Sequence, residues 1–136
     1  MRLAQALPRR LAPWRGSSRN SWLGSLRTTL RRLMLEIVAQ PHVARDFKYC
    51  DQCKDAATSA ASNIAEGFGR CRHREFAQFL RIAMGSLSEV SDLLIDGRAR
   101  GYVTATQLEA GIKLSTRARS ACAALTKYLL RTPDIL

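Results

Sequence analysis

The chain has 136 residues, of which 46% are hydrophobic and only 7% are aromatic. This length suits one domain with a modest core, and a core poor in aromatic residues favours helices over sheets. The net charge of +11 predicts attraction to polyanions such as RNA or DNA, although it says little about the fold.

The positive charge is concentrated near the beginning of the chain. Residues 1–35 hold eight arginines and no acidic residue, whereas residues 36–136 carry 14 basic and 11 acidic side chains. We therefore expect residues 1–20 to form a basic, disordered tail that could act as an arm on a polyanion. An organelle transit peptide and a start codon assigned too far upstream are alternative interpretations. The tail arginines are Arg2, Arg9, Arg10, Arg15 and Arg19.

Targeting signals are not evident in the sequence. Pro8, Arg9 and Arg10 interrupt the apolar stretch that a secretory signal would need. No run approaches the roughly 18 apolar residues of a membrane-spanning helix. We expect a cytoplasmic protein whose cysteines are reduced.

Two amphipathic helices are predicted in the first half of the chain, because apolar residues recur every three or four positions. The first runs from about Ser21 to Gln40 and is ended by Pro41. The second is closed by Gly67 and Gly69, which we expect in the left-handed conformation of a helix C-cap. The two apolar stripes are Leu23, Leu26, Leu30, Leu33 and Ile37, and then Phe47, Cys50, Cys53, Ala57, Ala60, Ile64 and Phe68.

Two further helices are predicted in the second half. The third ends at Gly101, and a second strip of Phe79, Ile82 and Leu93 is expected to widen its buried face. Thr104 is the expected N-cap of the fourth, and Pro133 lies beyond its end. The main stripes are Phe76, Leu80, Ala83, Leu87, Val90 and Leu94, and then Leu108, Gly111, Ser115, Ala118, Cys122, Leu125 and Leu129.

Short connections join the predicted helices, at roughly residues 41–44, 68–72 and 101–104. Short connections make consecutive helices antiparallel neighbours. We therefore expect an all-α protein with an up-down-up-down four-helix bundle over residues 21–132, followed by a short tail at residues 133–136.

Four segments of the chain resemble a known family. They are DFKYCDQ, SNIAEGFGR, EFAQFLRIAMGSLSEV and RGYVT, at residues 46–52, 62–70, 75–90 and 100–104. They are similar to those of the bacterial four-helix bundle proteins of the 23S rRNA intervening-sequence type. The resemblance implies a bundle that often assembles as a ring-shaped homopentamer, without recognised catalytic residues. Nucleic-acid binding is the usual suggestion for this family, and a related accessory protein of diversity-generating retroelements works with a reverse transcriptase.

The chain departs from the family pattern at several positions. Its first segment is longer and more basic, Cys53 and Cys71 replace apolar residues, and His73 stands near a common helix-starting residue. Gly97 stands in place of an alanine in the third helix, where we expect a cost of ~1 kcal/mol relative to alanine.

Asn63 and Glu66 lie three positions apart, so they share one helical face. Ser86 and Glu89 of the third helix are expected to face them. A paired-carboxylate acid–base site at Glu66 and Glu89 is one interpretation. A structural polar corner is favoured, because no histidine, nucleophile or metal-ligand set accompanies the pair.

Cys50, Cys53, Cys71 and His73 superficially suggest a zinc site. The spacing does not match a zinc ribbon or finger, and a thioredoxin-like site would need a βαβ setting. We expect Cys50 and Cys53 to be small core residues, and we expect no metal and no cofactor.

A basic cluster at the start of the third helix is the main candidate surface for nucleic acid. It joins His73 to Arg70, Arg72, Arg74 and Arg81. Helix N-termini attract anions, and arginine matches phosphate with its planar fork. A solvated turn offset by Glu75 is the competing interpretation. A second patch of Lys113, Arg117 and Arg119 lies on the fourth helix.

The sequence therefore predicts a non-enzymatic, oligomeric protein that binds nucleic acid, with RNA favoured. An interaction scaffold for a protein partner, such as a nucleic-acid enzyme, is the alternative. A third interpretation is a membrane-surface binder that uses the first helix, ranked last because the bundle needs the same apolar stripe.

Overall fold

The computed structural model describes residues 18–134, with side chains described from Gly24 onward. This part is all-helical and contains no strand. Its helices are α1 (Ser18–Ala39), α2 (Pro41–Ala44), α3 (Phe47–Phe68), α4 (His73–Ala99) and α5 (Ala105–Arg131). Residues 1–17, which include most of the predicted tail, lie outside the described residues, as do residues 135 and 136.

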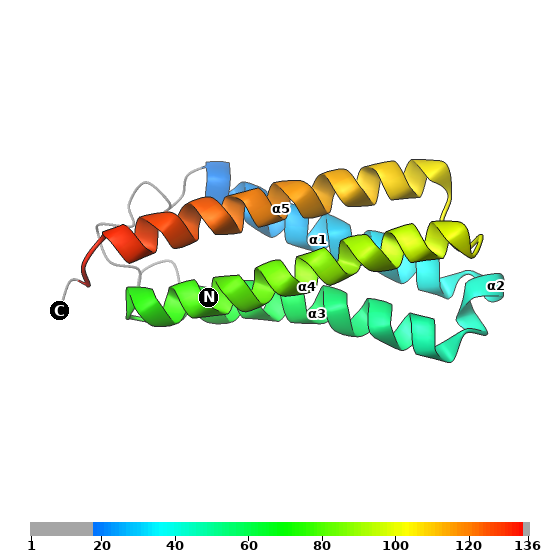
Figure 1. Cartoon of the computed structure of the whole chain (residues 1–136), viewed down its shortest axis with the longest axis horizontal. Coiled ribbons are helices and arrows are strands. Elements are labelled where there is room, and N and C mark those ends of the chain that lie inside the picture. The colour runs from blue at the N-terminus through cyan, green and yellow to red at the C-terminus, as the bar shows by residue number, and fades with distance from the viewer. Residues whose placement is uncertain (1–17, 135–136) are drawn as a thin grey trace.

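The four long helices lie alongside one another (Figure 1). Helix α3 packs against α4, α4 against α5, and α1 against both α3 and α5, which closes the circuit around one core. Helix α2, the start of α3 and the α4–α5 connection gather at one end of the molecule, as Figure 1 shows. The α3–α4 turn and the end of α5 lie at the other end.

Helix α1 ends one residue earlier than expected, and the described residues of its predicted stripe turn towards the core, while the side chain of Leu23 lies outside the described residues. Leu26, Leu30 and Ile37 are buried, and Leu33 is half-buried. Pro41 was predicted only to end this helix, but it also begins α2. A proline is tolerated at the first helical position because that N–H would have no partner inside the helix.

In helix α3 the predicted stripe is confirmed except at its start. Cys50, Cys53 and Ile64 are buried, but Phe47 is 78% exposed and Tyr49 is buried in its place. Phe47 is the first residue of the helix, and its side chain is left uncovered by the neighbouring helices. The prediction that Phe47 belongs to the core was wrong.

The role predicted for the glycines at the end of α3 was also wrong. Gly69 has an ordinary right-handed conformation with φ −83°. Gly67 is buried inside the helix, and a Cβ there would lie 2.6 Å from the Phe76 ring. Gly67 is therefore needed for the close approach of an aromatic side chain from α4.

Helices α4 and α5 bury the predicted main stripes, apart from the half-buried Leu108. The second strip on α4 divides: Leu93 is buried, Phe79 is half-buried and Ile82 is 48% exposed. Thr104 is confirmed as the N-cap of α5, because its hydroxyl accepts a hydrogen bond from the Gln107 N–H and the Gln107 side chain accepts one in return.

The end of α4 uses a left-handed glycine. Gly101 has φ +79° and is the one described residue with a positive φ. The Tyr102 N–H donates to the Gly97 carbonyl at 2.8 Å, and the Gly101 N–H donates to Arg98 at 3.2 Å. These two bonds form a Schellman motif, which turns the chain sharply towards α5.

Gly97 is required by the packing of α3 on α4. The buried Tyr49 hydroxyl donates a 2.7 Å hydrogen bond to the Leu93 carbonyl, one turn before Gly97. A Cβ at Gly97 would overlap the Tyr49 hydroxyl oxygen and would approach Val103 to 2.7 Å. The expectation that this glycine only weakens the helix was incomplete, because an alanine would displace the tyrosine.

We predict that Gly97→Ala destabilises the protein, although alanine is the better helix former. Overpacking against Tyr49 should lower the free energy of unfolding by about 1–3 kcal/mol. Gly85→Ala is the matched control, because nothing lies within 4 Å of a Cβ there; it should stabilise by about 0.5–1 kcal/mol. Urea unfolding followed by circular dichroism measures both, and equal stabilisation by the two changes would contradict the packing role.

Candidate nucleic-acid interface

The predicted basic cluster lies at the α3–α4 turn and on the first turns of α4. Arg72, Arg74 and Arg81 are exposed and make no ion pair with a described residue. Arg70 differs, because its guanidinium lies 3.0 Å from the Glu66 carboxylate and 4.8 Å from the centre of the Phe79 ring. One of the four arginines is therefore already partly neutralised.

The chain itself supplies an anion to the start of α4. The Asp134 carboxylate accepts a 2.7 Å hydrogen bond from the His73 N–H at the first residue of the helix. The His73 ring is buried, and its Nδ1 lies 2.8 Å from the Thr132 carbonyl oxygen, which makes this nitrogen the donor. A hollow of about 240 Å³ lies beside these residues and Arg74. The Asp134 carboxylate therefore occupies the anion-binding position at the N-terminus of α4, where a phosphate was expected.

The second predicted patch lies on α5. Lys113 and Arg117 are exposed. Arg119 is half-buried, and its guanidinium donates to the Ser88 hydroxyl of α4 at 3.0 Å. This arginine is therefore partly committed to joining two helices.

The predicted polar corner divides into two parts. The Asn63 amide donates to the Ser59 hydroxyl at 3.2 Å, and that hydroxyl lies 2.8 Å from the Ser86 hydroxyl of α4. Asn63 and Ser86 are therefore linked through Ser59. Glu66 and Glu89 are both exposed, and Glu66 pairs with Arg70 within its own helix. Neither carboxylate joins the Asn63–Ser59–Ser86 contact.

The cysteines and His73 that suggested zinc do not come together. Cys50 and Cys53 lie near the start of α3, whereas Cys71 and His73 follow its end, roughly 25 Å away at 1.5 Å per residue. No group of three potential metal ligands occurs in the described part of the chain. Burial raises the pKa of Cys53 to about 11 and that of Cys122 to about 12, so these two side chains are protonated thiols at neutral pH.

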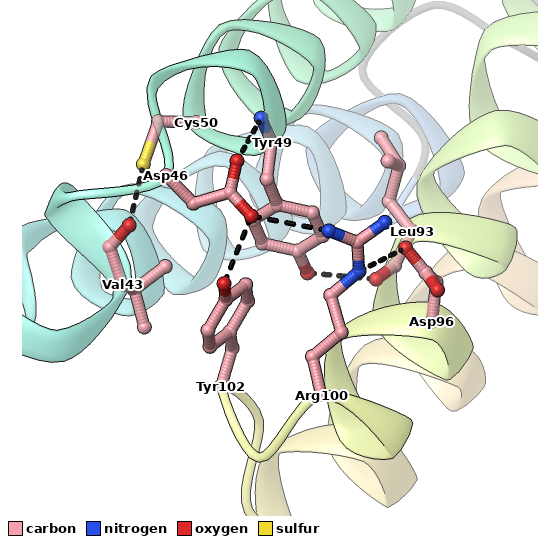
Figure 2. Close-up of polar contacts among 8 residues, drawn as sticks. All are labelled: Val43, Asp46, Tyr49, Cys50, Leu93, Asp96, Arg100 and Tyr102. Carbon is pink, nitrogen blue, oxygen red and sulfur yellow. Dashed lines mark hydrogen bonds and ion pairs between the residues drawn. The ribbon is translucent and has the colours of Figure 1, made fainter.

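A polar cluster at the α2 end of the molecule was missed by sequence reasoning. Figure 2 shows Asp46, just before α3, among donors from two other parts of the chain. Its carboxylate accepts from the Tyr49 N–H at 3.1 Å, the Tyr102 hydroxyl at 2.8 Å and the Arg100 guanidinium at 3.1 Å. Arg100 also pairs with Asp96 at 2.9 Å. These contacts lower the pKa of Asp46, with the Tyr49 backbone bond as the largest cause.

Two of the family-like segments meet in this Asp46 cluster, since residues 46–52 and 100–104 supply four of its five residues, Asp96 being the fifth. The model of the 23S rRNA-intervening sequence protein family matches residues 28–124 of the chain. The chain belongs to this family. A search of curated proteins found no match.

The resemblance inferred from the four segments is thus confirmed, and the family model covers most of α1 and α5 as well. Within this family member, the residues that carried the resemblance serve packing and capping between α3, α4 and the α4–α5 connection. Among the described helices, none has the length and hydrophobicity to cross a membrane.

We predict that Asp46→Asn lowers stability at neutral pH. Asparagine can still cap α3 but cannot pair with Arg100. Because the folded state lowers the pKa of Asp46 below its usual 3.8, the carboxylate contributes fully above about pH 4, and its contribution is lost as the pH falls through the lower pKa of the folded protein. The difference from the native chain should therefore shrink in acid.

Urea midpoints at pH 7 and in a series below pH 4 measure this effect. Asp51→Asn is the control, because Asp51 is an exposed carboxylate on the same helix without a hydrogen-bond partner among the described residues. A constant difference between the native chain and Asp46→Asn at every pH would show that the charge of Asp46 is not what matters.

Proposed function

We propose that this protein is a non-enzymatic, oligomeric nucleic-acid-binding protein of the cytoplasm, with RNA favoured over DNA, and that its fold is an antiparallel, up-down-up-down four-helix bundle. Three features support the bundle. Consecutive long helices are joined by short connections, they pack against each other, and α1 and α5 close the circuit. The family name supports an RNA-related role, since it refers to an insertion in ribosomal RNA.

The observation that carries the proposal is a surface of unneutralised cations. Residues 18–134 hold 18 basic and 11 acidic side chains. Yet among the side chains that the structure describes, only two arginines, Arg70 and Arg100, form ion pairs with a carboxylate. A surface with this excess attracts polyanions, and release of their counterions on binding makes the affinity strongly salt-dependent.

We also propose that the protein is not an enzyme. Glu66 and Glu89 are exposed side chains on the outside of their helices. In the described residues the buried thiols have raised pKa values, and no histidine or thiol contacts either glutamate. These features favour a binding surface over a catalytic site.

A protein-interaction scaffold is the second candidate, because several large apolar side chains are exposed. They are Leu35, Phe47, Ile82, Ile95 and Leu130. Exposed apolar side chains are a feature of contact surfaces, with another protein or with further copies of the chain, when they form a contiguous patch. Binding to a membrane surface through α1 is not favoured, because the described apolar face of this helix is buried against the other helices.

We predict that the protein binds unrelated RNA hairpins with similar affinity, and that the affinity falls linearly with salt on a log–log plot. Replacing Arg72, Arg74 and Arg81 with glutamine should make the slope shallower by about 0.7–0.9 for each phosphate that is no longer neutralised. Fluorescence anisotropy of labelled hairpins measures both quantities.

The matched control replaces Lys48, Lys54 and Lys127 with glutamine, since these exposed lysines give the same change in charge. If the control weakens binding equally, the cluster at the start of α4 is not a specific surface. If the native protein does not bind RNA at about 50 mM salt, the nucleic-acid proposal fails and the scaffold takes its place.

We predict a homo-oligomer, with a pentamer expected from the family. The exposed apolar side chains give copies of the chain surface to bury. Light scattering at micromolar concentration should report a mass several times the 15.2 kDa of one chain. A species of single-chain mass alone would contradict this prediction.

A further inference from the structure

A groove between α1 and α3 combines arginines with hydroxyl groups. It encloses about 300 Å³, and its lining residues come from one face of each helix. Helix α1 supplies Arg27, Thr28 and Arg31, and α3 supplies Thr58, Ala61, Ser62 and Ala65. No acidic and no aromatic side chain is among these lining residues.

The two arginines keep nearly all of their donors free. Arg27 and Arg31 lie four positions apart, so they share a face of α1 and repel each other. Neither pairs with a carboxylate of the described residues. Arg27 makes one hydrogen bond, to the Ala61 carbonyl, at the long distance of 3.5 Å. An anion placed between them would relieve the repulsion and accept several hydrogen bonds.

Small residues of α3 lie beside the two arginines. Arg27 and Arg31 also line a narrow space over Ala57, Ala60 and Ala61. Arg27 is half-buried there, so part of its conformational freedom is already lost in the folded protein. Binding of an anion to Arg27 therefore costs less side-chain conformational entropy than binding to a fully exposed arginine would.

Of the three hydroxyl groups in the groove, one is available as a donor to a ligand. The Thr28 and Ser62 hydroxyls donate to carbonyls of their own helices, at 3.0 Å and 2.8 Å. Thr58 has no hydrogen-bond partner for its hydroxyl among the described residues, so it remains available. Ala61 and Ala65 present only methyl groups, which leaves room for a ligand backbone.

We propose that this α1–α3 groove binds a phosphodiester of a nucleic-acid backbone through Arg27 and Arg31, with Thr58 as a neutral donor. The inference deepens the proposed function and rests on it. The groove differs from the start of α4, where Glu66 and Asp134 already supply carboxylates. Because no aromatic side chain of the described residues lines the groove, we expect no base stacking there and binding that is independent of sequence.

The test is an anisotropy titration of a labelled RNA hairpin with the full chain and Arg27→Gln/Arg31→Gln. We expect binding to weaken at least tenfold near 100 mM salt, and the log–log salt slope to become shallower by about 1.4–1.8, because two phosphates are no longer neutralised. The control is Arg32→Gln/Arg45→Gln, which removes two exposed arginines outside the groove. We expect the control to weaken binding less than threefold.

A second variant keeps both arginines. Ala65→Glu places a carboxylate at an exposed position of the groove, where it can occupy the guanidinium groups. We expect it to weaken RNA binding at least fivefold, while Ala124→Glu on the exposed face of α5 does not. Unchanged helical circular dichroism and thermal midpoints show that each variant is folded.

The outcomes separate this inference from the proposed function. If the native chain binds RNA and the groove variants weaken binding no more than their controls do, the groove proposal is overturned and nucleic-acid binding stands. If the native chain does not bind RNA, both fail. If the groove variants lose binding to phosphatidylserine vesicles while RNA binding is unaffected, the ligand is a lipid surface and the nucleic-acid assignment of the groove is wrong.

Discussion

One carboxylate, that of Asp46, connects two parts of the chain that are distant in sequence, the start of α3 and the α4–α5 connection. It caps the start of α3 and accepts hydrogen bonds from Tyr102 and Arg100, which lie 56 and 54 residues away. A carboxylate can accept several donors at once, and charge-assisted bonds are stronger than neutral ones. Because the turn after α4 can reach Asp46 only when α4 lies along α3, these bonds favour one alignment of the helices.

Close approach of the helices depends on small residues placed opposite large ones. Gly67 faces Phe76, Gly97 faces Tyr49, and a Cβ at Gly111 would lie 2.5 Å from Leu94. In each pair the side chain of one helix fills the space left by the missing Cβ of the other. The helices therefore approach closely at these glycines, and adding a single methyl group there would disturb the core.

The surroundings of the arginines differ between the start of α4 and the α1–α3 groove. At the start of α4, two carboxylates already interact with positively charged groups. Glu66 pairs with Arg70, one of the four arginines, and Asp134 accepts a hydrogen bond from the helix N-terminus. In the α1–α3 groove the guanidinium groups face alanines and hydroxyls instead. No carboxylate of the described residues competes with an external anion in the groove, which supports the phosphate-binding role that we propose for it.

The sequence alone determined the number, order and approximate bounds of the long helices, because their apolar residues recur with helical spacing and Thr104 and Gly101 mark an N-cap and a helix end. It also identified the family from four short segments. Only the tertiary structure decided which side chains at the helix ends are buried, such as Tyr49 in place of Phe47, since periodicity does not locate the neighbouring helix. The same holds for the Asp46 cluster, the Asp134 contact and the groove beside Arg27, because each joins residues whose separation in sequence carries no information about their distance in space.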